Sequence, residues 1–476
     1  MAKERYDAVV VGSGPNGLAA GITLARERLS VLLLEGDDTI GGGLRSAELT
    51  LPGFTHDICA AVHALGVSSP VLRSLDLASH GLNWVFPPAA VAHPLDDGTA
   101  VILRPGLETL REDLGQDGHA MRRILGPMVQ GWEPLVEGIL RPLPWPRNPL
   151  LLGKFGMKAV LSAVGLAKRH LKTRRAQALF AGLAAHSVLP LDRHMSASVG
   201  LVLGAAAIAV GWPLVKGGSQ ALADALACVF RSLGGEIQCN RWVSSWADIP
   251  EAKGILLDLT PRNLVRLGAG IFPPGYMRRL QEHPLGPGAF KLDWALSEPI
   301  PWRAKECLLA ATVHVGGSME EIVRGEGSVW KGRAPEKPFV ILVQPTLFDP
   351  TRAPEGRHVA WAYCHVPNGW DLDVTERIER QVERFAPGFR DTILARSVWG
   401  PRRFEEHNPN YTGGDFLGGP QDPVRLLVHP LGRWRPYRTP REGVYICSSS
   451  MPPGGGAHGM CGHNAARSAL TDLFSG

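Results

Sequence analysis

The sequence has few cysteines, and none of them are paired in a motif. Its 476 residues include seven cysteines, an odd number, and no two of them form a CxxC pair. Scattered cysteines of this kind predict reduced thiols and a cytoplasmic protein. They also argue against a dithiol redox centre, which needs two neighbouring thiols.

The sequence also has no large excess of positive or negative charge. The formal net charge is +5, and no basic stretch is interleaved with aromatic residues. Proteins that bind single-stranded nucleic acid need such a stretch, so nucleic acid is not an expected partner. The N-terminal segment MAKERYDAVVV lacks the apolar region of a secretory signal.

Long apolar segments are limited to one ambiguous case, from Ser198 to Val215. This segment contains Gly200, Gly204, Gly211 and Pro213. We therefore expect a buried helix here rather than a transmembrane span. A second segment, from Leu150 to Arg175, is apolar and then strongly basic. It predicts either a cap helix with a solvated basic end or a peripheral contact with an anionic membrane.

The composition is that of a globular protein of more than one domain. Hydrophobic residues make up 45% of the chain and charged residues 20%. A chain of this length buries a large core and usually divides into two or more domains.

The N-terminal pattern predicts one βαβ unit. A buried strand is expected over Tyr6–Val11, a helix over Asn16–Arg28 and a second buried strand over Ser30–Glu35. The first strand ends and the helix begins within VVVGSGPNGLAAG, which contains a GxGxxG motif. A motif in this position is typical of a dinucleotide-binding site.

Each element of this motif has a physical role. Gly12 permits the tight turn, Gly14 lets the backbone approach a pyrophosphate, and Gly17 lets the helix and strand pack closely. Glu35 ends the second strand, where a carboxylate can accept the ribose hydroxyls. This carboxylate disfavours a 2′-phosphate, so FAD or NAD is expected rather than NADP.

A second glycine turn follows in GGGLRSAEL, from Gly41 to Leu49. It is expected to place Arg45 near the same phosphates, because a guanidinium forms forked hydrogen bonds with pyrophosphate oxygens. The alternative is a surface loop with a solvated Arg45.

The rest of the chain alternates between helical and strand patterns. Residues 106–210 read as a helical cap, 211–260 as a helix and strands, 261–425 as a largely β substrate domain, and 426–476 as a return to the first domain. The elements expected within these parts are a helix N-capped by Ser219, strands over Glu236–Val243 and Gly254–Leu259, a helix over Val374–Phe385, a strand over Val444–Ile446 and a helix over Gly462–Phe474.

These motifs carry a resemblance to a known family. The segments DAVVVGSGPNGLAAGITLAR, LLLEGDDTIGGGLRSAELTLPGFTHDICAAVHAL, GWPLVKGGSQALADALACVFRSLGGEI, HNPNYTGGDFLGG and YRTPREGVYICSSSMPPGGGAHGMCGHNAARSAL resemble the phytoene desaturase-like flavoproteins. The branch they resemble most contains the pyridine nucleotide-disulphide oxidoreductase domain 2 proteins. The resemblance implies an α/β fold: a discontinuous Rossmann-type FAD-binding domain (1–105, 211–260 and 426–476), an α+β substrate domain and a helical cap.

The resemblance also implies which residues hold FAD. Gly12, Gly14 and Gly17 match the phosphate loop, and Gly455 to Met460 match the loop beneath the flavin. The cofactor-binding residues expected are Gly12, Ser13, Gly14, Pro15, Asn16, Gly17, Glu35, Gly36, Gly42, Gly43, Leu44, Arg45, Val243, Gly455, Gly456, His458, Gly459 and Met460.

The expected activity is dehydrogenation of a C–C bond in an apolar or cyclic substrate, with the flavin as hydride acceptor. The chain has no CxxC and no second GxGxxG, so it is not expected to reduce disulphides. Oxygen, a quinone or another acceptor would then reoxidise the flavin. The alternatives are a redox-neutral double-bond isomerase, a saturase, or a flavoprotein-fold interaction protein without turnover.

Candidate catalytic residues come from segments expected near the flavin. These are His458, His63 and Tyr411, with His56, Asp57 and Asp415 as further candidates. Asp57 more readily fits a structural hydrogen bond, and His63 a buried histidine of the core.

The tail PPGGGAHGMCGHNAA also raises the possibility of a metal site at His458, Cys461 and His463. We instead expect no metal, and a backbone cradle at the flavin's pyrimidine edge with His458 beside the ring.

Overall fold

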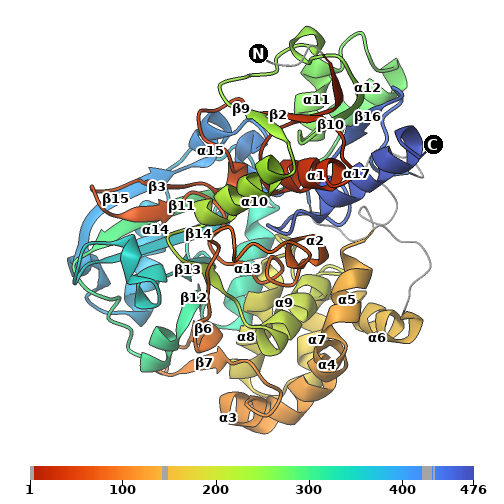
Figure 1. Cartoon of the computed structure of the whole chain (residues 1–476). Coiled ribbons are helices and arrows are strands. Elements are labelled where there is room, and N and C mark those ends of the chain that lie inside the picture. The colour runs from red at the N-terminus through yellow and green to blue at the C-terminus, as the bar shows by residue number, and fades with distance from the viewer. Residues whose placement is uncertain (1–4, 142–147, 421–430, 432–434, 476) are drawn as a thin grey trace.

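The computed structural model describes residues 5–141, 148–420, 431 and 435–475. Within them the chain forms a five-stranded sheet, a seven-stranded sheet and two short two-stranded sheets, with a group of helices beside the larger sheet (Figure 1). This arrangement confirms the predicted α/β fold class. The predicted boundary between residues 425 and 426 lies outside the described residues.

The five-stranded sheet is parallel throughout and has the order β16-β10-β1-β2-β9. Its strands are β1 (Tyr6–Val11), β2 (Val31–Leu34), β9 (Glu236–Gln238), β10 (Ala252–Leu257) and β16 (Val444–Ile446). They come from three distant parts of the chain, so the predicted Rossmann-type architecture is indeed discontinuous.

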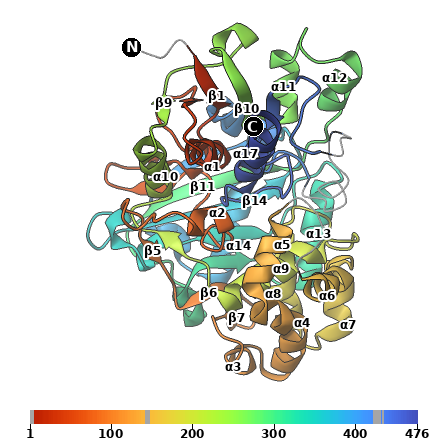
Figure 2. The same ribbon diagram turned by 45° about the vertical axis from the view of Figure 1, so that its right-hand side comes forward.

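Small residues bring the helices of this sheet close together. Helix α1 (Pro15–Ala25) packs against α10 (Gln220–Ser232) and α17 (Met460–Leu473), and both views show α1 and α17 side by side (Figures 1 and 2). A Cβ on Gly462 would lie 1.8 Å from the carbonyl oxygen of Asn16. Glycine is therefore required where these two helices touch.

The seven-stranded sheet has the order β15-β11-β14-β13-β12-β6-β7 and is antiparallel except at the β12–β6 pair. Its strands are β6 (Ala89–Pro94), β7 (Ala100–Leu103), β11 (Gly288–Leu296), β12 (Ala310–Val315), β13 (Val340–Val343), β14 (His358–Val366) and β15 (Ile393–Trp399). Strands β6 and β7 lie within the segment predicted as the first part of the FAD-binding domain, yet they join this second sheet.

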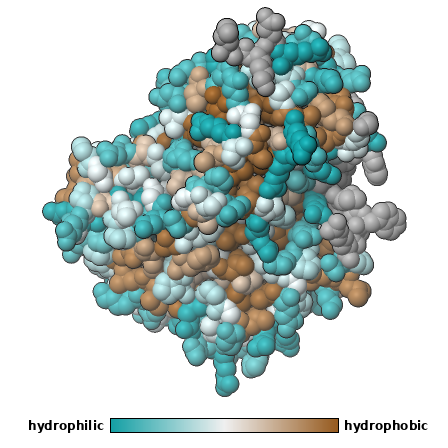
Figure 3. All heavy atoms as spheres, viewed as in Figure 1, coloured by the Kyte–Doolittle hydropathy of each residue, from teal (hydrophilic) through white to brown (hydrophobic). Residues whose placement is uncertain are grey.

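The helical region covers part of the seven-stranded sheet. Its helices are α3 (Leu110–Leu114), α4 (Gly118–Gln130), α5 (Trp132–Ile139), α6 (Pro149–Ala159), α7 (Ala163–His170), α8 (Arg174–Ala185) and α9 (Ala197–Ala209). Helices α8 and α9 contact β6 and β7. Hydrophobic residues reach the surface in several places on the face shown in Figure 3. On α6, the side chains of Leu150 and Met157 are exposed.

The segment 198–215 forms the largely buried helix α9 and the short strand β8 (Leu214–Val215). Among the described residues no helix is by itself long and apolar enough to cross a membrane. The bent pair α6 and α7 meets the length and composition test only when taken together.

The remaining elements connect these layers. They are α2 (Pro70–Arg73), α11 (Pro261–Leu267), α12 (Pro274–Gln281), α13 (Met319–Val329), α14 (Thr375–Phe385), α15 (Pro401–His407), and the small sheets β3 (Ser46–Glu48) with β4 (Thr55–Asp57) and β5 (Trp84–Val85) with β8.

Two local predictions are corrected. The strand expected over Glu236–Val243 ends at Gln238, because the chain then leaves the sheet. Ser219 precedes α10 but makes no side-chain cap, because its hydroxyl donates to the carbonyl of Ala60 at 2.6 Å.

Candidate functional site

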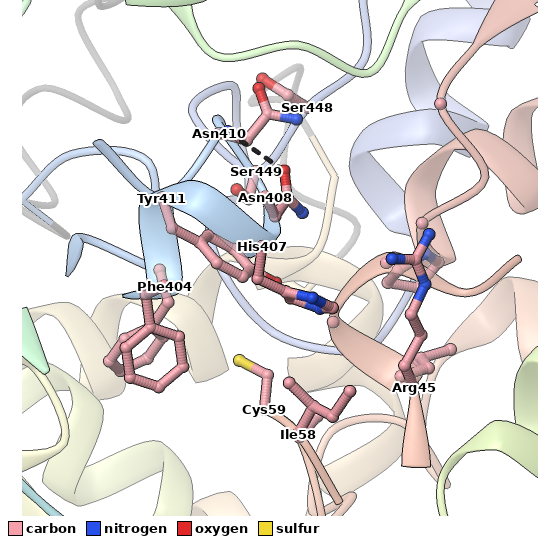
Figure 4. Close-up of a pocket in the computed structure, with 18 of the residues that line it drawn as sticks. Arg45, Ile58, Cys59, Phe404, His407, Asn408, Asn410, Tyr411, Ser448 and Ser449 are labelled. Carbon is pink, nitrogen blue, oxygen red and sulfur yellow. Dashed lines mark hydrogen bonds between the residues drawn. The ribbon is translucent and has the colours of Figure 1, made fainter. Parts of the chain in front are cut away.

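A cavity of about 920 Å³ is lined by residues of both large sheets. One wall consists of the loops that follow β1, β2 and β10, and another is a face of the seven-stranded sheet. Figure 4 shows part of this cavity, with Arg45 on one side and Phe404 and Tyr411 on the other. Both halves of the predicted site therefore open into one space.

The loop after β1 is shaped for an anion. Gly12 has a φ of 102°, which only glycine adopts readily, and a Cβ on Gly17 would lie 1.9 Å from the Gly12 carbonyl oxygen. Helix α1 begins at Pro15 on the cavity wall. The positive end of a helix favours phosphate groups, and binding of a pyrophosphate at this loop stays a prediction.

Glu35 follows β2 and lines the same end of the cavity. Its Oε2 accepts the Ser13 N–H at 2.9 Å and its Oε1 accepts the Asp37 N–H at 3.0 Å. Arg45 donates to Glu35 at 3.2 Å and to Asp37 at 2.5 Å. The placement of Arg45 near the phosphates stays a prediction: Arg45 lines the cavity together with the glycine loop, and the two carboxylates hold its guanidinium in place.

The two glycine turns touch each other. A Cβ on Gly42 would lie 3.1 Å from the Cα of Gly14, so the second turn packs directly on the first. Trp242 covers Gly36, where a Cβ would lie 2.2 Å from the indole ring. Trp242 and its neighbour Val243 both line the cavity. They form its wall beside Gly36, and Val243 is one of the cofactor-binding residues that the resemblance implies.

The tail contributes backbone to the cavity but not the side chain of His458. Gly455 and Gly456 line the cavity. The buried ring of His458 accepts the Met460 N–H through Nδ1 at 3.1 Å, and burial lowers its pKa to about 4. The expectation that His458 lies beside the flavin is corrected, because its ring turns back to bond the first turn of α17. Gly459, like His458 and Met460, is not part of the cavity wall.

The other two residues of the possible metal cluster have separate partners. Cys461 donates to the carbonyl oxygens of Met451 and Gly454, both at 3.3 Å. Nδ1 of His463 pairs with the hydroxyl of Thr23 at 2.9 Å. Each side chain is thus engaged in packing the tail against its surroundings.

Of the predicted cofactor-binding residues, most line the cavity. They are Gly12, Ser13, Gly14, Pro15, Asn16, Glu35, Gly36, Gly42, Gly43, Leu44, Arg45, Val243, Gly455 and Gly456. Gly17 acts one layer behind the wall, where it lets α1 approach β1.

The seven-stranded sheet presents a mainly apolar face to the cavity. The residues on this face are Ala289, Lys291, Thr312, Ile341, Val343, Trp361 and Tyr363. They lie side by side across strands: Lys291 is opposite Tyr363, and Tyr363 is opposite Ile341. The rings of Trp361 and Tyr363 are stacked with centroids 5.8 Å apart. Such a surface favours an apolar ligand.

One buried ion pair interrupts this apolar face. Nζ of Lys291 lies 2.5 Å from Oδ1 of Asp293, and both side chains are almost fully buried. Burial raises the pKa of Asp293 to about 6, although Lys291 acts in the opposite direction. Lys291 also lies over the Trp361 ring, 5.2 Å from its centroid. The cavity therefore contains a fixed cation beside its aromatic wall.

The three catalytic candidates are not brought together. Tyr411 lines the cavity, and burial raises the pKa of its phenol well above the ordinary value. His63 is buried outside the cavity wall, pairs with the Ser219 hydroxyl at 2.9 Å, and has its pKa lowered to about 4 by burial. His63 is thus a buried core residue with one ring nitrogen, Nε2, paired.

The further candidates have structural partners. Asp57 forms a buried ion pair with Arg352 at 3.0 Å, as its interpretation as a structural residue predicted. His56 pairs with the Thr50 hydroxyl at 2.9 Å. Asp415 accepts the Gly286 N–H at 2.7 Å and three N–H groups of its own loop.

Several cavity residues were not found from the sequence. They are His186, Trp212, Trp242, Asp258, Lys291, Trp361 and Tyr363. A signal existed for two of them. Asp258 ends a strand of the parallel sheet, where ligands usually bind, and Lys291 with Asp293 places two charges on one face of an apolar strand. The aromatic residues look like ordinary core residues in the sequence.

The residues present fit FAD. The glycine turn leaves no room for a side chain, the helix N-terminus opens on the cavity, and the carboxylate of Glu35 stands at the end of the neighbouring strand. With the discontinuous Rossmann-type sheet and the separate substrate sheet, these features define the class of FAD-dependent oxidoreductases.

Comparison with known proteins places the chain more closely. Residues 10–76 match the sequence profile of the NAD(P)-binding Rossmann-like domain. The chain is 23% identical to the pyridine nucleotide-disulfide oxidoreductase domain-containing protein 2 of Mus musculus, over 99% of this chain and 94% of that protein. It is 27% identical to the neurosporene-forming phytoene desaturase of Rhodobacter capsulatus, over 52% of this chain and 51% of the desaturase.

The fold is shared more widely. A variant of putrescine oxidase superposes with a TM-score of 0.63 at 18% identity, covering 99% of both chains. Together these findings confirm the resemblance to the phytoene desaturase-like flavoproteins, and they confirm FAD as the cofactor of the class.

Proposed function

We propose that this oxidoreductase dehydrogenates a C–C bond of an apolar or cyclic substrate. The observation that carries the proposal is the continuity of the cavity. It runs from the phosphate-binding loop at Gly12 to the aromatic face at Trp361 and Tyr363. A substrate on that face would share one cavity with the cofactor, as hydride transfer requires.

FAD, when bound, supplies the hydride acceptor. The loop after β1 and Glu35 would hold its phosphate and ribose groups, and the glycines at 455 and 456 would leave room beside it. The stacked rings of Trp361 and Tyr363 orient an apolar substrate and exclude water. Burial raises the pKa of Tyr363 and of Tyr411, so both phenols stay protonated and act as hydrogen-bond donors rather than bases.

A cationic amine fits this cavity less well than a neutral substrate, although putrescine oxidase shares the fold. The cation of Lys291 projects from the sheet face, and its carboxylate partner Asp293 is already engaged. The described sheet residues that line the cavity include no carboxylate. A second positive charge there would be repelled by Lys291 at short range.

Oxygen, a quinone or another acceptor would then reoxidise the flavin. Substrate delivery from a membrane surface through α6 and α7 stays a prediction, supported by the exposed side chains of Leu150 and Met157 and by the basic residues that follow them.

Anaerobic mixing tests the proposal. The FAD-loaded protein is mixed without oxygen with a neutral-lipid extract, while the visible flavin absorbance and the masses of the extract components are recorded. We expect the flavin to bleach and one component to lose two hydrogen atoms. A product formed without bleaching would instead support double-bond isomerisation, and failure to take up FAD would support a non-catalytic role. The same mixture with protein stripped of FAD is the control.

A further inference from the structure

Helix α6 has apolar side chains on its outer side as well as on its inner side. On the inner side, Leu152 and Phe155 pack against the core of the helical region. On the outer side, the exposed fractions of Leu150, Met157 and, directly after the helix, Val160 are 82%, 70% and 48%. The outer side of a surface helix in a globular protein is normally polar. The fold alone gives this outer side no reason to be apolar.

The three exposed residues form one stripe, called here the outer stripe. Met157 follows Leu150 by seven residues, nearly two helical turns, and Val160 follows Met157 by three. Side chains at these spacings lie on the same side of a helix. In both ribbon views α6 lies at the edge of the helical region (Figures 1 and 2). The outer stripe is therefore open to a partner that approaches from outside.

The segment that carries the outer stripe is basic and contains no acidic residue. From residue 148 to residue 191 the sequence has no Asp or Glu, and its Lys and Arg residues are Lys154, Lys158, Lys168, Arg169, Lys172, Arg174 and Arg175. The side chains of Lys154, Lys168, Arg169 and Arg174 are exposed, and none of them has an ion-pair partner within the described part of the chain. Exposed apolar side chains beside unpaired cations are typical of helices that lie at a membrane surface.

We infer that α6 docks the protein on the surface of an anionic phospholipid bilayer. The outer stripe enters the boundary between headgroups and acyl chains, and the basic side chains contact lipid phosphates. The helix lies along the surface, because its 11 residues span only about 16 Å of a hydrocarbon core about 30 Å thick. The bend of 96° between α6 and α7 keeps the pair from crossing as one helix. The inference rests on no step of the proposed reaction.

Charge complementarity favours a bilayer over other partners of this surface. A second copy of the chain would bring the same basic residues against themselves, because a two-fold interface pairs a surface with itself. Nucleic acid would match the positive charge but would leave the outer stripe exposed to water. An anionic bilayer offers phosphate groups to the cations and an apolar interior to the outer stripe.

The docking helix adjoins the helix that borders the cavity. Helix α6 packs against α9, and Leu203 of α9 lines the cavity. A bilayer on the outer stripe would therefore lie one helix away from the cavity wall. An apolar molecule dissolved in that bilayer would be concentrated beside the helical region.

Co-sedimentation with vesicles tests the inference without any turnover. The FAD-loaded full chain is mixed with vesicles of phosphatidylcholine alone, or of phosphatidylcholine and phosphatidylglycerol in equal parts, and the bound fraction is measured after centrifugation. We expect a dissociation constant about a hundredfold lower, or more, with the anionic vesicles. It should rise at least about tenfold between about 0.1 M and about 1 M salt, because salt screens the basic side chains.

Two double variants separate the apolar contribution from the charged one. Leu150→Gln with Met157→Gln should weaken binding to the anionic vesicles about tenfold for each residue. Lys168→Gln with Arg169→Gln should weaken it about fivefold for each residue. All four side chains are exposed and lie outside the cavity wall, so FAD uptake and the far-ultraviolet circular dichroism spectrum should be retained.

Leu372→Gln with Leu394→Gln is the matched control, because these side chains are 60% and 47% exposed outside the helical region. Vesicle binding should not change in this variant. Equal weakening by the control and by Leu150→Gln with Met157→Gln would overturn the inference, as would equal binding to both kinds of vesicle or binding to neither. A dimer that Leu150→Gln with Met157→Gln dissociates while vesicle binding persists, or tighter binding to a DNA duplex than to the anionic vesicles, would also overturn it.

Discussion

Asp258 should make FAD binding depend on pH. It follows β10 at the cavity, and its Oδ2 accepts the Gly17 N–H at 3.0 Å. The carboxyl therefore stands at the N-terminus of α1, where the pyrophosphate is expected to bind. Burial raises the pKa of Asp258 to about 7, and the nearby charge of Glu35 adds to the effect. Cys447, Cys461 and Tyr411 also face this carboxyl, and all three stay protonated near neutral pH because their pKa values are raised.

The size of the effect follows from linkage. Below pH 7 the carboxyl is neutral and compatible with a pyrophosphate, and above pH 7 its charge repels one. If FAD binds only when Asp258 is neutral, the dissociation constant rises about tenfold per pH unit above the pKa of about 7. At about pH 8.5 the loss of affinity should be about thirtyfold relative to about pH 6.

Fluorescence titration of FAD into protein without cofactor measures this dependence. Asp258→Asn is the matched variant, since the amide oxygen can still accept the Gly17 N–H but cannot ionise. We expect a steep rise of the dissociation constant in the wild type and a much flatter profile in Asp258→Asn. The same slope in both proteins would show that the titrating group is not Asp258.

Two further substitutions test the packing around the site. Gly462→Ala forces a Cβ to 1.8 Å from the Asn16 carbonyl and should lower the free energy of unfolding by about 1–3 kcal/mol or more. A Cβ on Gly327 would meet nothing within 4 Å, so Gly327→Ala should instead raise the free energy of unfolding by about 0.5–1 kcal/mol. Denaturant unfolding of both variants measures these changes. Arg352→Met leaves Asp57 buried without its partner and should cost about 3–5 kcal/mol by the same assay, whereas an unchanged midpoint would show that Arg352 contributes little.

The local parts of the fold were predictable from the sequence. Strand β1 matches its predicted bounds, and α1 and β2 begin and end within three residues of theirs, because glycine turns and apolar runs mark them. The individual strands of the seven-stranded sheet and their pairing could not be predicted from the sequence. Strand β11 is buried along its whole length, so it shows no alternation, and the pairing of β6 with β12 joins segments about two hundred residues apart.

The same distinction holds for the site. The glycine loop after β1 is local, so its turn and the start of α1 could be read from the sequence, whereas the partners of Arg45 and His458 could not be known. The guanidinium of Arg45 is oriented by its hydrogen bonds to two carboxylates, and the ring of His458 is oriented by the hydrogen bond that it accepts from the Met460 N–H. His186 and Lys291 line one cavity only because the folding of the seven-stranded sheet brings their segments together, so their spacing in the sequence gives no sign of it.

The central claim is that one cavity holds FAD at the glycine loops and leaves the sheet face for substrate. A crystal structure of the FAD-loaded protein tests it most directly. We expect the ribose beside Glu35, the flavin ring beside Gly455 and Gly456, and open space bounded by His186, Lys291 and Trp361. A flavin ring that fills the sheet face, or FAD bound away from the loop after β1, would contradict it.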